Sequence, residues 1–280
     1  MSGKREKFDK IVFVSFLLLT STTALVALNV TLVYGIDSGP PSGVSVWSAD
    51  FESGDQGAWN WYAEQQPQNA IISVSSQTIN NGGYSGYYYY LGNPNGKGDS
   101  IRAYPSEILD PRPATFYVQF WVYVPSVVNG QQVKIANWVS FASLWLNSPP
   151  AYPWNGPSVN PITIDSFTNQ QLALWLGPLK TSSGPSDPYY VYQTNPITWP
   201  FDKWFSIGVF GIIQPAGNSS IIVYQNGVQI IKYVGNLGAD CTGLGQMHYG
   251  LYADPAQATI AFYNDDINVF VYPLQVTRRS

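Results

Sequence analysis

Segment 115–124 alternates between apolar side chains and larger side chains that can recognise a ligand. Successive side chains of a strand point to opposite faces, so this segment should have one core face and one aromatic and amide face. The apolar positions are Phe116, Val118, Phe120, Val122 and Val124, and the opposite positions are Tyr117, Gln119, Trp121 and Tyr123. Aromatic rings stack on the C–H face of a sugar, and amides hydrogen-bond its hydroxyl groups. The second face therefore suits a sugar.

Four further segments divide in the same way, with basic and aromatic side chains opposite apolar ones. They are 100–104, 132–146, 171–176 and 246–252, and their outward positions include Arg102, Gln132, Lys134, Trp138, Trp175, His248 and Tyr252. If these strands share one sheet with 115–124, they form a concave surface lined with rings and hydrogen-bond donors. Arg102 and Lys134 would add positive charge there, which suits a uronate or sulfate group. The alternative is a purely structural face, because a sandwich with 20 Tyr, 13 Phe and 10 Trp residues places some rings outward or under loops.

Composition narrows the class of protein. The chain has 280 residues, 45% hydrophobic and only 11% charged, which is enough apolar material for a large core and unlike a disordered chain. The formal charge of −4 argues against a nucleic-acid partner, which requires a dominant basic surface. Cys241 is the only cysteine, so an intrachain disulfide and a thiolate metal cluster are both excluded.

Short β-prone segments separated by Gly, Pro and Asn turns fill most of the chain, and no segment predicts a long helix. Asn226-Gly227 between two apolar runs is the strongest hairpin signal. Single strands are predicted at 132–146, 259–263 and 267–272. More than ten strands with frequent turns predict an all-β sandwich or barrel in one domain at 46–280.

The N-terminus carries a targeting signal. Lys4, Arg5, Lys7 and Lys10 precede the uncharged stretch 11–35, which is long enough to span a bilayer. Residues 1–36 are therefore expected to be an uncleaved membrane anchor or a cleaved signal peptide, followed by a Pro- and Gly-rich linker at 37–45. In either case the folded domain is exported to the extracellular side.

Several motifs resemble those of the concanavalin A-like superfamily of LamG-type jelly rolls, across nearly all of 46–273. The resemblance rests on Asp50-Phe51-Glu52-Ser53-Gly54-Asp55 before Trp59, Trp121-Val122-Tyr123-Val124-Pro125, Asn226-Gly227-Val228, Tyr249-Gly250-Leu251-Tyr252 and Tyr263-Asn264-Asp265-Asp266-Ile267. It implies a jelly-roll β-sandwich. The opening motif also resembles galactose-binding-like carbohydrate-binding modules, which is the alternative sandwich.

Among the enzymes of that superfamily, the chain resembles polysaccharide lyases of the alginate and heparin lyase type. Such lyases need an Arg or amide to neutralise a carboxylate, a His or Tyr base and a Tyr acid for β-elimination. The resemblance would match Arg102 to the arginine, Asn137 to a glutamine that precedes the catalytic His, and Tyr252 to the tyrosine. His248, the only histidine, could supply the base from another strand. The chain departs from the pattern because Trp138 and Val139, not a catalytic His, follow Asn137. His248 and Tyr249 also replace the Lys-Ala pair expected before Gly250.

Related folds hold a structural calcium ion with acids near the first and last strands. Asp50, Glu52 and Asp266 are the candidates, since calcium prefers oxygen ligands, and the alternative is that these acids cap turns. No other cofactor is expected.

We therefore predict an exported, membrane-associated domain that binds a polysaccharide and no nucleic acid. The first alternative is a lyase that cleaves an acidic glycan, and the second is a structural protein of a cell envelope that uses the aromatic face for assembly.

Overall fold

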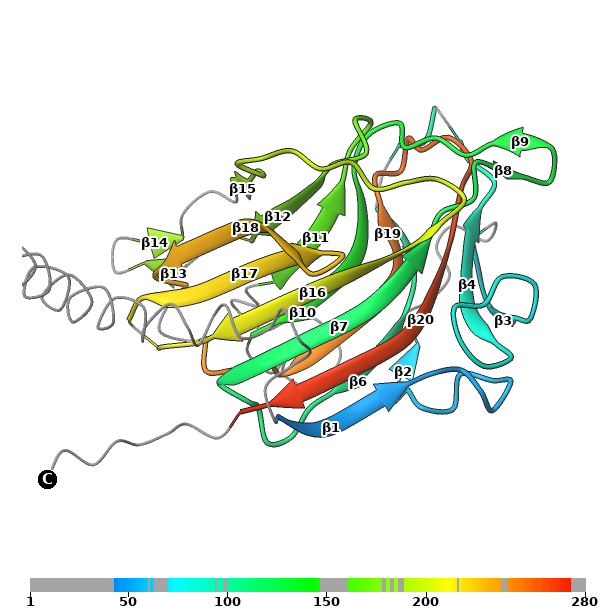
Figure 1. The fold of residues 1–280 in the computed structure, drawn as a ribbon. Coiled ribbons are helices and arrows are strands. Elements are labelled where there is room, and N and C mark those ends of the chain that lie inside the picture. The colour runs from blue at the N-terminus through cyan, green and yellow to red at the C-terminus, as the bar shows by residue number, and fades with distance from the viewer. Residues whose placement is uncertain are drawn as a thin grey trace, which may run out of the picture. The chain divides into compact units, whose positions relative to one another are not determined.

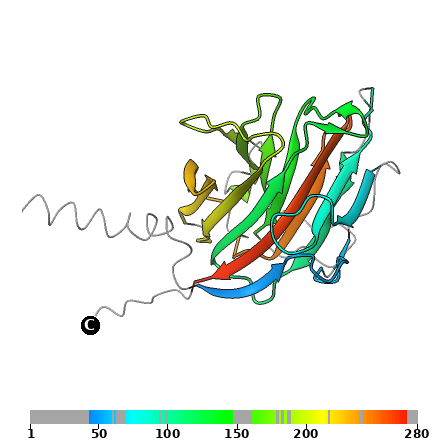
Figure 2. The same ribbon diagram turned by 45° about the vertical axis from the view of Figure 1, so that its right-hand side comes forward.

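The chain from Gly43 onward folds into two antiparallel β-sheets packed face to face (Figures 1 and 2). The computed structural model describes residues 43–59, 61–62, 70–93, 95–97, 100–146, 161–177, 180–181, 184–185, 189–215, 217–237 and 241–272. The expected N-terminal anchor at 1–36 and most of the expected linker lie outside these residues. Within the described ranges, no helix is long and apolar enough to cross a membrane.

One sheet, called the β7 sheet here, has eight strands and faces the viewer in Figure 1. β7 (Thr115–Tyr123) lies near its centre, between β16 (Trp204–Ile212) and β20 (Ile260–Val271). The remaining strands are β17 (Ser219–Gln225) and β18 (Val228–Gly235) beyond β16, and β4 (Ser85–Tyr90), β3 (Ala70–Ser75) and β1 (Val44–Ala49) on the side of β20. β1 begins inside the expected linker.

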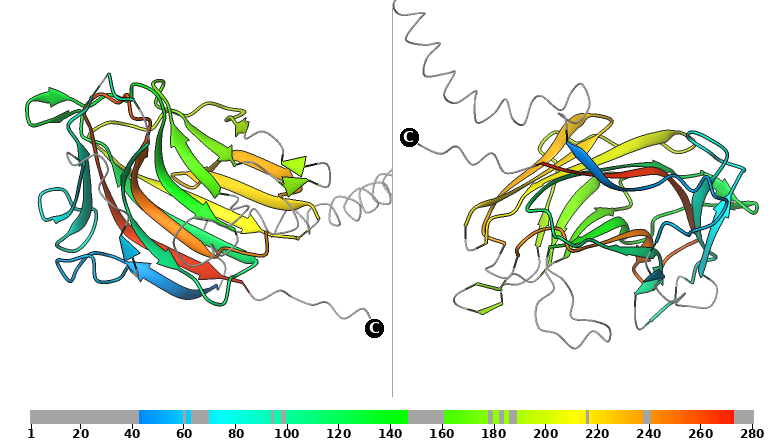
Figure 3. Two further views of the ribbon diagram at one scale, coloured as in Figure 1. Left: turned by 180° about the vertical axis from the view of Figure 1, so that it is seen from behind. Right: turned by 90° about the horizontal axis from the view of Figure 1, so that it is seen from below.

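The other sheet, called the β10 sheet, also has eight strands and is seen from behind in Figure 3. β10 (Val139–Trp145) lies between β11 (Pro161–Ser166) and β19 (Gln246–Ala253). β12 (Leu172–Leu176) and β15 (Tyr189–Val191) continue beyond β11, while β6 (Pro105–Ile108), β5 (Ile101–Ala103) and β2 (Trp61–Tyr62) lie on the side of β19. Two short ribbons complete the described strands, β8 (Val127–Val128) with β9 (Gln131–Gln132) and β13 (Lys180–Thr181) with β14 (Gly184–Pro185).

The hydrophobic core fills the space between the sheets, and β7 shows how the alternating pattern builds it. Phe116, Val118, Phe120 and Val122 are completely buried in this core, as their spacing predicted. Burial of each such side chain stabilises the fold by roughly 1.5–3 kcal/mol. The β10 sheet supplies the other half of the core in the same way, with Leu172, Leu174 and Leu176 all buried.

The predicted hairpin at Asn226-Gly227 is confirmed. It joins β17 to β18, and both of its residues have the positive φ angles, 51° and 77°, that a two-residue turn between twisted strands requires. The all-β class is likewise confirmed, and of the two architectures that the turn spacing allowed, sandwich and barrel, the domain has the sandwich.

Two predicted strand assignments are wrong. Segment 132–146 is not one strand, because β9 ends at Gln132 and β10 begins only at Val139. The two strands predicted at 259–263 and 267–272 are one strand, β20, whose register shifts at a bulge between Asp265 and Asn268. Asp266 adopts a φ of +48° in this bulge, a backbone change that a period-2 pattern does not reveal.

The groove that included 115–124 required the aromatic strands to share one sheet, and they do not. β7 belongs to one sheet, whereas β5, β10, β12 and β19 belong to the other. The outward side chains of the two sheets point away from the common core, in opposite directions. Tyr117, Gln119 and Trp121 therefore cannot form one groove with Trp138, Trp175 and Tyr252.

Candidate functional site

The outer face of the β10 sheet brings a guanidinium, a phenol, a hydroxyl and a carboxylate into one row across four strands. Tyr252 on β19 lies directly opposite Arg102 on β5 and, on its other side, opposite Ser140 on β10. Ser140 in turn lies opposite Asp165 on β11. Alternate residues of these strands lie in the core, so the four polar side chains share the outer face.

Aromatic rings frame this row. The Trp138 ring lies 5.1 Å from the Tyr252 ring, and the Tyr104 ring lies 6.2 Å from it on the other side, both in edge-on geometry. Trp138 and Tyr252 are half-buried, whereas Tyr104 is buried. Trp138 and Tyr252 therefore keep surface that a ligand could contact, beside a positively charged side chain.

His248 lies under this aromatic layer. Its ring stacks on Tyr104, which lies between β5 and β6, at 4.5 Å and on Trp145 of β10 at 5.0 Å. Only 3% of the residue is exposed, and burial, with a further contribution from the Arg102 charge, lowers the pKa of His248 to about 3. The imidazole is therefore uncharged at neutral pH, and a group with so low a pKa is a weak general base.

A buried carboxylate and a tyrosine form a second polar pair on this face. The hydroxyl of Tyr190 on β15 donates a 3.0 Å hydrogen bond to Oδ2 of Asp165, which is 3% exposed. Burial, and then the Asp165 charge, raise the pKa of Tyr190 well above its ordinary value. Tyr190 therefore stays protonated, and it lies directly opposite Trp175 of β12.

The structure brings together five of the predicted site residues, namely Arg102, Trp138, Trp175, His248 and Tyr252, on the β10 sheet. Asn137, which occupies the position of a lyase glutamine by resemblance, is exposed and donates to Asp254. Gln132 and Lys134 do not lie on a strand of this face; they line a pocket formed by loops at one end of the sandwich.

Trp145, Asp165 and Tyr190 belong to this face but were not predicted as site residues. Segment 161–166 alternates Ile162 and Ile164 with Thr163 and Asp165, a signal that could have identified β11 and its outward acid. The pairing of Tyr190 with Asp165 joins residues 25 positions apart and follows only from strand order.

The outer face of the β7 sheet holds the other predicted residues. Tyr117 is 6% exposed; its ring lies 6.4 Å from both Phe270 and Tyr224, and burial raises its pKa to about 12. Gln119 and Trp121 are half-buried farther along the strand. The Tyr117 ring therefore packs against its neighbours on the same face.

The predicted calcium ligands lie near the turn at 80–84, where backbone N–H groups bind the carboxylates. Glu52 accepts hydrogen bonds from the backbone of Gly83 and Tyr84, and Asp266 accepts one from the side chain of Asn80. Asp50 accepts one from the backbone of Glu52. Nowhere in the described ranges do three or more His, Cys, Asp or Glu side chains converge to hold a metal ion. These hydrogen bonds are the kind expected of acids that cap turns, and calcium binding by Asp50, Glu52 and Asp266 stays a prediction.

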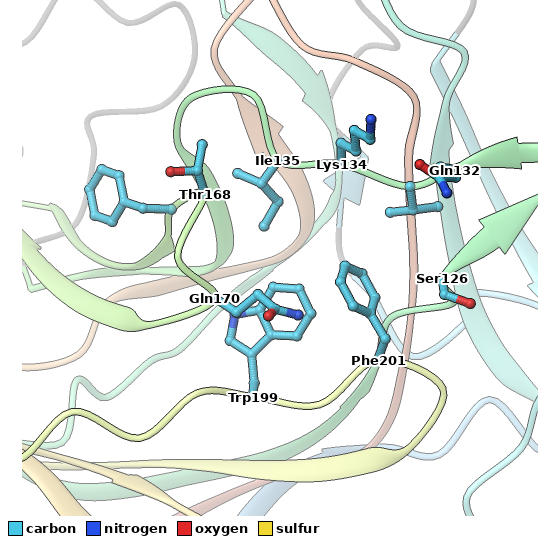
Figure 4. Close-up of a pocket in the computed structure, with 10 residues that line it drawn as sticks. Ser126, Gln132, Lys134, Ile135, Thr168, Gln170, Trp199 and Phe201 are labelled. Atoms are coloured by element: carbon cyan, nitrogen blue, oxygen red, sulfur yellow. The ribbon is translucent and has the colours of Figure 1, made fainter.

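A pocket of about 490 Å³ opens at the end of the sandwich where the loops before β10, between β11 and β12, and before β16 meet (Figure 4). Ile135 and Phe201 point into it from opposite sides, and Gln170 lies over Trp199 at its base. Its volume falls in the range of small-molecule sites.

No protein-family model matches the sequence, and no curated protein matches it. Solved structures do match the fold. The endo-β-1,4-glucuronan lyase of the fungus Trichoderma reesei superposes with a TM-score of 0.63 at 14% identity, covering 82% of this chain and 96% of that chain. The domain has the jelly-roll fold of polysaccharide lyases.

Two further structures agree. The alginate lyase vAL-1 from Chlorella virus matches with a TM-score of 0.58 at 12% identity, over 82% of this chain and 100% of that chain. The cellulose-induced protein Cip1 matches with a TM-score of 0.56 at 17% identity, over 80% of this chain and 97% of that chain. The predicted resemblance to jelly-roll lyases is confirmed at the level of the fold, and the low identities carry the comparison no further.

Proposed function

We propose that this domain binds an acidic polysaccharide on the outer face of the β10 sheet. The observation that carries the proposal is the position of Arg102 directly opposite Tyr252, with the ring of Trp138 5.1 Å from that of Tyr252. Half-buried aromatic rings suit the C–H face of a pyranose, and a guanidinium suits its carboxylate. Asp165 and His248 are buried on the same face and contact neighbouring rings and hydroxyl groups.

The fold supports this proposal. The matched structures include proteins named as glucuronan lyase and alginate lyase, so polysaccharide chemistry is known on this architecture. The net charge of −4 makes Arg102 a local exception, and an acidic ligand is the class that such an exception favours.

Cleavage by β-elimination is the second candidate function. It needs a cation to neutralise the uronate carboxylate and a phenol to move a proton, and Arg102 opposite Tyr252 could supply both. His248 does not supply the base, because it is buried between two rings and its pKa is about 3. Cleavage would therefore depend on Arg102 and Tyr252 without His248, and we keep it as the second candidate.

A glycan array and a lyase assay on the same polymers separate these functions. Binding alone should retain acidic glycans on the protein without generating ultraviolet absorbance from an unsaturated uronate end. A lyase should generate that absorbance, and Tyr252→Phe should abolish it while leaving the ring in place. Absence of both binding and cleavage, together with self-association, would favour the envelope-assembly alternative and overturn the proposal.

We also propose that the domain is displayed outside the cell by the segment 1–36, on the basis of its basic start and uncharged stretch. Mass spectrometry of the membrane-bound protein should find this segment intact. A mature N-terminus within or just after it would instead show cleavage and secretion, and protein retained in the cytoplasm would overturn export itself.

A further inference from the structure

The pocket at the end of the sandwich has an apolar floor and a polar rim. Val133, Ile135 and Trp199 are nearly fully buried, and Phe201 adds a half-buried ring beside them. The Nε1 group of Trp199 already donates to Ser166, so the indole offers the pocket carbon surface only. Such a floor suits the apolar face of a small ligand.

The rim carries amide, hydroxyl and ammonium groups. Gln132, Gln170, Thr168 and Ser126 can donate to or accept from hydroxyl groups, and among the described residues that line the pocket Lys134 alone is charged. The Lys134 side chain is exposed, and the described part of the chain shows no carboxylate within ion-pair distance of it. The rim is thus equipped for a polar ligand that carries a negative charge.

Backbone hydrogen bonds hold the loop that carries Lys134 in place. The N–H of Val133 donates to Ser126, that of Lys134 to Thr259 at 3.1 Å, and that of Ala136 to the fully buried side chain of Gln257 at 3.0 Å. Along this loop Val133 and Ile135 are buried on the floor, and Lys134 is exposed on the rim. Figure 4 draws the Lys134 ammonium group pointing away from Phe201 and Trp199, so it must turn inward to meet a ligand.

The opposite wall is fixed in the same way. The carbonyl of Gln170 accepts the Trp199 N–H at 2.9 Å, and Gln170 has a φ of +58°, an uncommon backbone conformation for a residue other than glycine. Asp202, also at positive φ, accepts hydrogen bonds from Ser126 that hold the pKa of its carboxyl below the ordinary value. Its carboxylate is therefore engaged with the backbone beside the pocket.

We propose that this pocket is a second carbohydrate site, which takes one hexuronate residue, that is, a sugar ring carrying a carboxylate. The ring lies on the floor beside Phe201, the amides of Gln132 and Gln170 bind its hydroxyl groups, and Lys134 binds the carboxylate. The choice of a sugar as the occupant rests on the proposed function, but the site is separate from the outer face of the β10 sheet. A charge-assisted hydrogen bond to Lys134 makes the site selective for the acid over the neutral sugar.

Titration of the full-length protein with glucuronate and with glucose, followed by calorimetry and saturation-transfer NMR, tests the site. Lys134→Gln should weaken glucuronate binding about tenfold and leave glucose binding unchanged. Lys232→Gln, which changes an exposed lysine on β18, is the matched control and should have no effect.

A second variant removes any doubt from misfolding. Gln170→Gly keeps the positive φ angle at no steric cost while it deletes the amide, so it should weaken binding of both sugars without lowering stability. Unchanged glucuronate binding in both Lys134→Gln and Gln170→Gly would overturn the inference.

Trp138→Ala separates this inference from the proposed function. The pocket account expects this variant to bind glucuronate normally while it loses the polymer. Polymer binding that depends on Trp138, without any glucuronate binding in the pocket, would overturn the pocket site and leave the proposed function standing. Glucuronate binding that depends on Lys134, without polymer binding on the face, would overturn the proposed function and leave the pocket site standing.

Discussion

The outer faces of the β7 sheet and the β10 sheet are both lined with aromatic rings, but the rings have different neighbours. On the β7 sheet, Tyr123 packs between Tyr263 at 5.9 Å and Trp204 at 5.6 Å, so ring covers ring. On the β10 sheet, Tyr252 lies between Trp138 and Tyr104 and directly opposite Arg102. Trp121 and Tyr123 are half-buried, as Trp138 and Tyr252 are, so neither aromatic content nor exposure distinguishes the two faces. The difference on which the proposal rests is the Arg102 charge beside the rings of the β10 sheet.

The ionisable groups of the two faces also differ, in burial and in what they bind. Asp265 of the β7 sheet is buried, and its carboxylate accepts hydrogen bonds from the backbone of Asn80 and Asn81. The loop that supplies these donors also accepts the Trp204 Nε1–H, at the carbonyl of Ile79. The polar groups of the β7 sheet thus hold a loop in place, whereas Arg102 on the β10 sheet lies at a partly exposed position.

Replacing one tryptophan on each face should give the largest difference. Trp138→Ala should weaken binding of an acidic polysaccharide by about 2 kcal/mol, roughly thirtyfold, because a central ring of the proposed site is lost. Trp121→Ala, which removes a half-buried ring from the β7 sheet, should bind as the unchanged protein does. Affinity electrophoresis in gels containing the polymer measures both, and an equal loss from the two variants would erase the contrast between the faces.

Removal of the Arg102 charge should have the next largest effect. Arg102→Gln should weaken binding of an acidic polymer by about 1.5 kcal/mol, roughly tenfold, and the loss should shrink as salt is added. Arg112→Gln is the matched control, since Arg112 is exposed in the loop before β7. If Arg102→Gln lowered the affinity for a neutral polymer as much as that for the acidic one, Arg102 would not bind a carboxylate.

The β7 sheet should respond in stability rather than in binding. Asp265→Asn should lower the free energy of unfolding by about 1–3 kcal/mol, because an amide cannot accept all the backbone N–H groups that the buried carboxylate accepts. Urea denaturation measures this loss. Polysaccharide binding, measured under conditions in which the variant is fully folded, should not change. Loss of binding in a fully folded Asp265→Asn protein would contradict the division of roles.

The pH dependence of stability sharpens the account of His248 and should be the smallest effect near neutral pH. Burial lowers its pKa from 6.5 to about 3, so below pH 6.5 the unfolded chain binds a proton that the folded protein does not. Stability from this residue is therefore complete above pH 6.5 and falls toward pH 3, with a slope of at most about 1.4 kcal/mol per pH unit.

His248→Gln should remove this slope. Urea denaturation of both proteins at pH 7.5, 6.5, 5.5 and 4.5 measures it, and the carboxylates common to both proteins cancel in the difference. Parallel stability curves for the two proteins would show that His248 titrates in the folded state as freely as in the unfolded chain.

Much of the fold followed from local pattern. The alternation in 115–124 correctly separated the core residues of β7 from the outward ones, and Asn226-Gly227 correctly located a hairpin. These features depend on neighbours in the chain, which a single sequence displays directly.

The assignment of strands to sheets did not follow, because a period of two distinguishes inside from outside but not one sheet from the other. Tyr117 and Tyr252 have the same pattern around them and lie on opposite sides of the molecule. Segment 132–138 also alternates, but its N–H groups bind loops and the side chain of Gln257 instead of a neighbouring strand. Long-range partners decided both outcomes.

Hydroxyl-radical footprinting with and without an acidic polysaccharide tests the central claim most directly, because it reads both faces in one experiment. The polymer should protect Trp138 and Tyr252 on the β10 sheet and leave Trp121 and Tyr123 on the β7 sheet as reactive as before. Protection of Trp121 and Tyr123 instead, or no protection on either sheet, would contradict the claim that the outer face of the β10 sheet is the binding surface.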